Sequence, residues 1–134
     1  MPDDELIAQA LAALENAYAP YSRFPVGSAV ATDRGVFVGV NVENASYGLS
    51  ICAERVAIGA AIAAGATRIT EVAVASTSSP PAAPCGACRQ VIAEFGPDAR
   101  ILLAGTGGER AATSLPELLP ASFAFTPPSA GGGE

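Results

Sequence analysis

The chain of 134 residues contains no histidine and no lysine. Without histidine it cannot build a Ser-His-Asp or Cys-His nucleophile system, or use an imidazole general base. Without lysine it cannot form a Schiff base with a substrate or a pyridoxal cofactor, and it has no phosphate-loop lysine. If the protein is an enzyme, we therefore expect carboxylates to move its protons and a metal or cofactor to act as its electrophile.

Charge is also scarce. Only 15% of the residues are charged, against about 25% in an ordinary domain, and the net charge is −6. The seven cationic residues are all arginines and are spread along the chain, whereas affinity for nucleic acid comes chiefly from clustered Lys and Arg. We therefore expect no nucleic-acid partner. A small domain with so little surface charge often hides part of its surface in a homo-oligomer.

The sequence shows no targeting segment and no long hydrophobic run. Residues 1–5 (MPDDE) are acidic where a signal peptide is basic, and the longest apolar run, 56–66, is about half a membrane span. Three cysteines cannot all pair with one another, which disfavours a secreted disulfide framework. These features predict a cytoplasmic protein with no membrane partner.

Hydrophobic periodicity and turn residues predict a single domain over 1–125, followed by a disordered tail over 126–134. The predicted elements are helices at 3–18, 52–65 and 85–94, strands at 27–32, 36–41, 71–76, 100–104 and 111–114, and a helical turn at 115–119. The helix at 52–65 carries no charge beyond Arg55, so we expect it to be buried, in the core or at a subunit interface. This order of elements predicts an α/β fold with helices packed on the faces of a sheet.

The chain does contain three cysteines, each near a predicted helix N-terminus: Cys52, and the pair Cys85 and Cys88. The N–H groups and the dipole of a helix N-terminus favour thiolate, the form that binds zinc. A structural zinc site normally needs four protein ligands, and a redox dithiol would leave Cys52 without a role. Three buried structural thiols are a further alternative. A catalytic zinc needs three protein ligands and one open position for water, which matches the cysteine count.

Glu54 lies two residues after the first of these cysteines. A lone glutamate in the first turn of a helix often only balances the helix dipole on a solvated face. Beside a candidate zinc ligand, however, we predict a catalytic role. A zinc-activated water needs a carboxylate that accepts its proton and passes it to the leaving group.

The segment CAER at 52–55, followed by PCGACRQ at 84–90, resembles the cytidine deaminase superfamily in its all-cysteine form. The similarity runs from 18–22 through 41–44 to 118–120, and the chain looks most like the small homotetrameric cytidine deaminases that act on free nucleosides. This resemblance implies a three-layer αβα sandwich with a mixed five-stranded sheet and one Zn²⁺ per chain. It also implies hydrolytic deamination of cytidine and deoxycytidine in pyrimidine salvage.

The resemblance also implies roles for individual residues around the zinc. Glu54 takes the proton of the water, protonates N3 of the cytosine ring and helps to protonate the departing amine. Three thiolates on one Zn²⁺ leave a negative site, and we expect Arg55 and Arg89 to donate hydrogen bonds to the sulfurs and offset it. Substrate-binding residues are implied at Phe24, Asn41, Glu43, Tyr47, Ala53 and Phe123.

Asn41 and Glu43 are two residues apart at the end of a predicted strand, so both side chains point to one side, where they suit the hydroxyls of a ribose. Phe24 is expected to form a wall of the base pocket. By resemblance, Phe123 covers the pyrimidine from a neighbouring subunit, although Phe125 is close enough to take its place in the alignment. Tyr47 is likewise expected to reach across an interface, so that active sites are shared between subunits.

Two other functions remain open at this point. A related deaminase of another aminopyrimidine, such as blasticidin S, would share the zinc motif, although the full NVEN segment at 41–44 favours a nucleoside. A dithiol redox protein or a non-catalytic zinc-binding module would use the cysteines without deamination. Metal content tests the redox alternative, because one zinc per chain supports the enzyme, whereas no zinc and a reversible dithiol support the redox protein.

Overall fold

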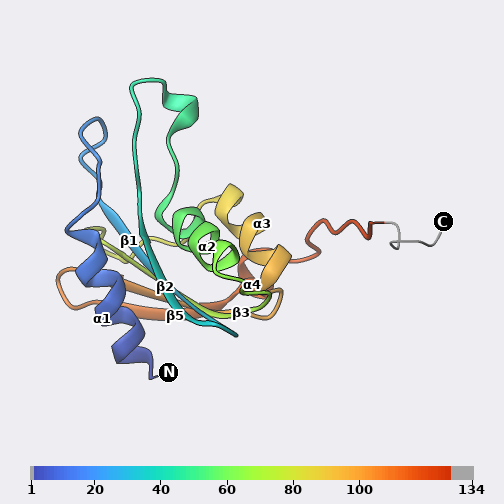
Figure 1. The fold of residues 1–134 in the computed structure, drawn as a ribbon. Helices are drawn as coiled ribbons and strands as arrows, with labels where there is room; N and C mark the ends of the chain where they lie inside the picture. Colours follow the sequence, from blue (N-terminus) through green and yellow to red (C-terminus); the bar gives the residue numbers. More distant parts are fainter. Residues whose placement is uncertain (1, 128–134) are drawn as a thin grey trace.

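The computed structural model describes residues 2–127, and its fold is drawn in Figure 1. In chain order the elements are α1 (Asp3–Leu14), β1 (Val26–Thr32), β2 (Gly35–Val40), the 3-10 helix η1 (Tyr47–Leu49), α2 (Ala53–Ala63), β3 (Ile69–Ser76), α3 (Gly86–Phe95), β4 (Arg100–Gly105), β5 (Arg110–Ser114) and α4 (Leu115–Leu118). The predicted tail over 126–134 lies, from residue 128 onward, outside the described residues.

The five strands form one mixed sheet in the order β2-β1-β3-β4-β5, as the resemblance implied. Strand β1 pairs antiparallel with both β2 and β3, β3 pairs parallel with β4, and β4 pairs antiparallel with β5. A parallel pair needs a crossover connection, which α3 supplies between β3 and β4. The hairpin between β1 and β2 turns at Gly35, whose φ of +104° favours glycine.

Helices cover both faces of this sheet, which gives the predicted three-layer αβα arrangement (Figure 1). The alternation of side chains along β3 separates the two cores. Ala73 and Ala75 face α1, while Val72 and Val74 belong to the larger cluster beneath α2 and α3. Small residues allow α2 to pack closely on β2. A Cβ on Gly39 of β2, for example, would lie 2.4 Å from the backbone nitrogen of α2 at residue 57.

Helix α1 ends at Leu14, four residues before the predicted end. Tyr18 leaves the helix because it pairs with the segment around Val42: its N–H donates to the carbonyl of Asn41 at 3.0 Å, and its carbonyl accepts from the N–H of Glu43 at 2.9 Å. This pairing brings two segments together. We call residues 19–25 the proline loop and residues 41–51 the arm.

Helix α2 is buried on its inner side within the single chain, and burial of its outer side at a subunit interface stays a prediction. Its inner side packs on the sheet, while Gly59, Ala60 and Ala63 are exposed in the single chain. The helix covers a single face of the sheet, and within the described residues no further layer covers it. Across residues 2–127, none of the helices combines the length and the apolar character that crossing a bilayer requires.

Candidate active site

The three cysteine sulfurs meet where α2 and α3 begin. Cys52 is the N-cap residue of α2, Cys85 is the N-cap residue of α3, and Cys88 lies in the first turn of α3. The Cys85 Sγ lies 3.8 Å from the Cys52 Sγ and 3.4 Å from the Cys88 Sγ, and all three atoms lie within 4.8 Å of one another. Sulfurs bound tetrahedrally at about 2.3 Å from zinc are about 3.8 Å apart, so the donor set fits one Zn²⁺ with a vertex left open.

Charge is distributed unevenly among these thiols. A hydrogen bond from Cys88, supported by the guanidinium of Arg55, lowers the pKa of Cys52 to about 5. The same contact with Cys52, together with burial and the nearby carboxylate of Glu54, raises the pKa of Cys88 far above its usual range. A divalent cation among the sulfurs supplies the charge that allows all three to be thiolates.

The two arginines beside the ligands have different contacts. The Arg55 Nη2 donates to the Cys52 Sγ at 3.5 Å, and its buried Nε has no hydrogen-bond partner within residues 2–127. Arg89, which we also expected to donate to a sulfur, donates from Nε to the carbonyl of Pro84 at 2.8 Å and from Nη1 to the carbonyl of Leu118 at 2.9 Å. Arg89 therefore fastens the loop before α3 to α4, while Arg55 lies against the ligand itself.

Glu54 is the second residue of α2 and is only 4% exposed. Burial raises the pKa of its carboxyl, and the negative charge of Cys52 adds to the effect. A carboxyl with a raised pKa holds a proton more readily than an exposed carboxyl, which suits acid–base catalysis. The structure thus holds a suitable acid–base group beside the cysteine cluster.

A cavity of about 230 Å³ opens beside this cluster. Its lining includes seven residues singled out from the sequence, namely Phe24, Asn41, Glu43, Cys52, Ala53, Glu54 and Cys85. The other lining residues belong to none of the sites predicted from the sequence; they are Ser22, Val26, Val74, Ala82 and Ala83. Four of these five are small apolar residues or valine, types that carry no functional signal in a sequence.

Asn41 and Glu43 are both engaged with the proline loop and the start of β1. The Asn41 side chain accepts from the N–H of Val26 and donates to the carbonyl of Phe24, both at 2.9 Å. The Glu43 carboxylate accepts from the hydroxyl of Ser22 and from two backbone N–H groups of the loop. These bonds lower the pKa of Glu43 and keep it ionised, and the bond from the Ser22 hydroxyl has the largest effect.

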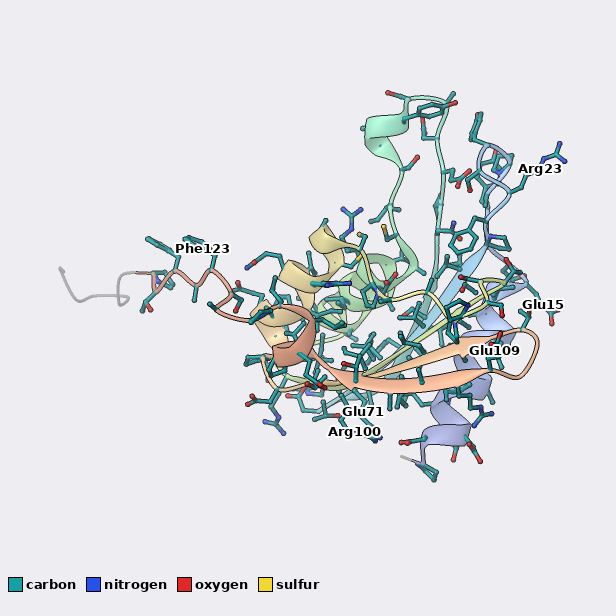
Figure 2. All side chains as sticks on the ribbon, turned by 180° about the vertical axis from the view of Figure 1, so that it is seen from behind. Glu15, Arg23, Glu71, Arg100, Glu109 and Phe123 are labelled. Atoms are coloured by element: carbon teal, nitrogen blue, oxygen red, sulfur yellow. The ribbon has the colours of Figure 1, made fainter. Side chains whose placement is uncertain are left out.

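Tyr47 and Phe123 lie outside this cavity. Tyr47 is 74% exposed, meets Tyr21 edge-on at a ring distance of 5.9 Å, and lines a second cavity of about 350 Å³. Phe123 is 73% exposed on a segment that runs away from the body of the protein (Figure 2), where its carbonyl accepts from the Gln90 side chain at 3.1 Å. Their expected substrate contacts need a second copy of the chain and stay predictions.

Known proteins resemble the chain in both sequence and fold. The family profile of the cytidine and deoxycytidylate deaminase zinc-binding region matches residues 1–104. A cytidine deaminase of Halalkalibacterium halodurans is 46% identical over 120 residues, which are 88% of this chain and 91% of that protein. A cytidine deaminase of Sporosarcina psychrophila is 41% identical over 125 residues, 92% of each chain.

Solved structures give the same picture. The cytidine deaminase of Burkholderia pseudomallei is 50% identical and superimposes with a TM-score of 0.88, covering 92% of this chain and 100% of that one. The cytidine deaminase of Bacillus anthracis, at 17% identity and a TM-score of 0.70, shows the shared fold alone. These likenesses do not favour a blasticidin S deaminase, a dithiol redox protein or a non-catalytic zinc module.

Proposed function

The chain belongs to the cytidine and deoxycytidylate deaminase family, which catalyses hydrolytic deamination, and we propose that it converts cytidine and deoxycytidine, with water, into uridine and deoxyuridine and ammonia. The observation that carries the proposal is the cavity at the three cysteines. It joins a zinc donor set, a buried carboxyl and two polar side chains suited to a sugar. Such a reaction would serve pyrimidine salvage.

Cys52, Cys85 and Cys88 would hold one Zn²⁺ per chain, which when bound activates a water molecule at its open position. Glu54 would accept one proton of that water and deliver it to N3 of the cytosine ring, and would then carry the second proton of the same water to the amine, which leaves as ammonia. Its burial and raised pKa support this shuttle, because the group must take up and release a proton twice in each turnover.

The remaining cavity residues would bind the nucleoside. The ring of Phe24 would form a wall against the base, Asn41 and Glu43 would meet the ribose hydroxyls, and Ala53 would leave room beside the base. No cationic side chain lines this cavity within the described residues, and the ionised Glu43 would repel a phosphate. Both observations support a free nucleoside rather than a nucleotide.

The oligomer and the location are part of the same proposal. Apolar side chains at Tyr47, Leu49, Phe123 and Phe125 are each at least 70% exposed, and exposed apolar surface of this kind marks protein interfaces. We expect a homotetramer in which Tyr47 and Phe123 of one subunit complete the cavity of another. Size-exclusion chromatography with multi-angle light scattering would measure the number of subunits. Three free cysteines in the site favour a reducing compartment, the cytoplasm.

An ultraviolet assay of cytidine and of deoxycytidine with zinc-loaded protein tests the proposed reaction. Zinc per chain is measured on the same sample, and blasticidin S serves as the competing substrate. We expect one zinc per chain and turnover of both nucleosides. If neither nucleoside reacts at full zinc occupancy, the proposal is wrong, and turnover of blasticidin S alone would instead identify the related deaminase.

A further inference from the structure

We propose that Ser22 is a positioning residue that couples the carboxylate of Glu43 to the ring of Phe24. Ser22 lines both the cavity at the cysteines and the neighbouring cavity of about 350 Å³. Its hydroxyl donates to the carboxylate of Glu43, expected to hold the sugar, and accepts from the backbone N–H of Phe24, whose ring is expected to hold the base. The inference rests on the proposed nucleoside deamination and names a residue on which substrate binding depends.

Glu43 binds the proline loop at three points. Its Oε1 accepts from the N–H groups of Tyr21 and Ser22, both at 3.0 Å, and its Oε2 accepts from the hydroxyl of Ser22. Ser22 therefore contacts both oxygens of the carboxylate, one through its backbone and one through its side chain. Two contacts from one residue fix the rotation of a carboxylate, which a single hydrogen bond does not.

Phe24 is held at both of its peptide groups. Its N–H donates to the Ser22 hydroxyl oxygen at 3.0 Å, and its carbonyl accepts from the Asn41 side chain at 2.9 Å. Phe24 is 37% exposed, so packing alone does not determine the position of its ring. Both side chains expected to bind the sugar thus also hold the backbone of the expected base wall, and for Glu43 the connection runs through one hydroxyl.

The arrangement leaves capacity for a ligand. A carboxylate has about four acceptor positions and a side-chain amide has two N–H donors. Three positions on Glu43 and one donor on Asn41 are occupied by the chain itself, so one acceptor position and one N–H remain. Because the two side chains are already ordered, binding a sugar costs them little further conformational entropy.

The test compares Ser22→Ala and Ser22→Thr with Ser46→Ala, each as zinc-loaded enzyme. Ser46 is a matched control, because it is an exposed residue of the arm whose hydroxyl makes no hydrogen bond in the described part of the chain. Kinetics are measured with cytidine and with 2′,3′-dideoxycytidine, which lacks the sugar hydroxyls that Glu43 would bind. Amide hydrogen exchange of residues 21–26 is followed in parallel without substrate.

We expect Ser22→Ala to lower kcat/KM for cytidine about tenfold, mainly through KM, and to lower it about twofold for dideoxycytidine. The threonine variant, which keeps the hydroxyl, should recover most of the loss, and Ser46→Ala should match the wild type. Exchange at 21–26 should be faster only in Ser22→Ala. An effect that depends on the sugar distinguishes positioning of Glu43 from simple support of the loop.

An equal loss with both substrates, or no loss beyond that of Ser46→Ala, would overturn the proposal. Unchanged exchange at 21–26 in Ser22→Ala would overturn it independently of turnover. Wild-type protein that deaminates neither substrate would contradict the proposed function instead. In that case the exchange measurement still decides whether Ser22 holds the loop.

Discussion

The two ends of the β1–β2 hairpin carry the same hydrogen-bond arrangement in different surroundings. Just beyond the end of β2, Glu43 accepts from two backbone N–H groups and one hydroxyl of the proline loop. Just beyond the end of β1, Asp33 accepts from the N–H groups of Thr67 and Arg68 at 2.9 Å and 3.1 Å, and from the Thr67 hydroxyl at 2.6 Å. In both carboxyls these bonds hold the pKa below its usual range. We call each carboxylate with its three hydrogen bonds a clamp.

The difference between these clamps lies in what surrounds them. Glu43 shares its cavity with the cysteine cluster and Glu54, whereas Asp33 joins the hairpin to the segment that enters β3. We therefore expect equivalent local chemistry to support binding at one end and only folding at the other. Substitutions at the cavity end should change catalysis more than stability, and a substitution at Asp33 should do the reverse.

The largest effect is expected from Glu54→Gln, because it removes the carboxyl that we propose moves the protons at the cavity end. Glutamine keeps the shape of the side chain but cannot carry the proton, and we expect kcat to fall about 10³- to 10⁴-fold. Zinc per chain should stay at one, since Glu54 is not part of the sulfur donor set. The matched control is Glu94→Gln, an exposed position of α3. Loss of zinc together with activity would instead show that Glu54 is structural.

A smaller loss is expected from Glu43→Ala, which removes the clamp at the cavity end. The variant loses both the expected sugar acceptor and the hold on the proline loop, so kcat/KM for cytidine should fall about 100-fold, mostly in KM. Glu109→Ala, at an exposed position in the turn between β4 and β5 (Figure 2), is the control. A fall in kcat with KM unchanged would contradict a binding role for Glu43.

The two arginines beside the cysteines are also expected to differ in role: Arg55 should affect zinc binding, and Arg89 should affect stability. We expect Arg55→Ala to weaken zinc about 10- to 100-fold in a chelator competition, because its guanidinium lies against the Cys52 sulfur. Arg89→Ala loses two hydrogen bonds to backbone carbonyls, so it should destabilise the metal-free chain by about 1–3 kcal/mol.

The opposite result for Arg89 would be equally informative. If Arg89→Ala weakens zinc as much as Arg55→Ala and leaves the unfolding of the metal-free chain unchanged, Arg89 donates to a sulfur once zinc is bound. That outcome would restore the role expected from the sequence. Thermal unfolding and chelator competition on the same two preparations decide between these results.

Features that depend on neighbours in the sequence could be predicted, and those that depend on distant partners could not. Cys52, Glu54 and Cys85 lie at helix N-termini, as predicted from apolar periodicity and loop residues, which are local signals. The bond between Ser22 and Glu43 joins residues 21 apart, and the bond from Arg89 reaches Leu118 across 29 residues. No local pattern shows which loops become neighbours.

The predicted end of α1, at residue 18, is wrong for the same reason. The periodicity of the helix continues to Tyr18, but pairing of Tyr18 with Val42 on the arm prevails over it. The burial of α2 could not be judged from composition either. Its alanines and glycines are compatible with both a covered and an uncovered side, and a sequence does not say how many layers enclose a helix.

The smallest effect is expected from Asp33→Ala, at the end of the hairpin away from the cavity. Kinetic constants for cytidine should be unchanged, while the melting temperature falls by about 2–5 °C as the exposed clamp to Thr67 and Arg68 is lost. The loss should depend on pH. The folded pKa of Asp33 lies below that of the unfolded chain, about 3.9, so its contribution is complete above that value and disappears as the pH falls through the folded pKa.

The free energies of unfolding of wild type and Asp33→Ala should therefore differ by a constant amount from pH 8 to pH 5, and the difference should shrink progressively as the pH falls below about 4 toward the folded pKa. Asp98→Ala, an exposed aspartate before β4, controls for the removal of a charge and should track the wild type throughout. A difference that persists in acid would mean that Asp33 acts through packing and not through its charge. A change in KM would mean that the two ends of the hairpin are coupled, so that the remote clamp also takes part in binding.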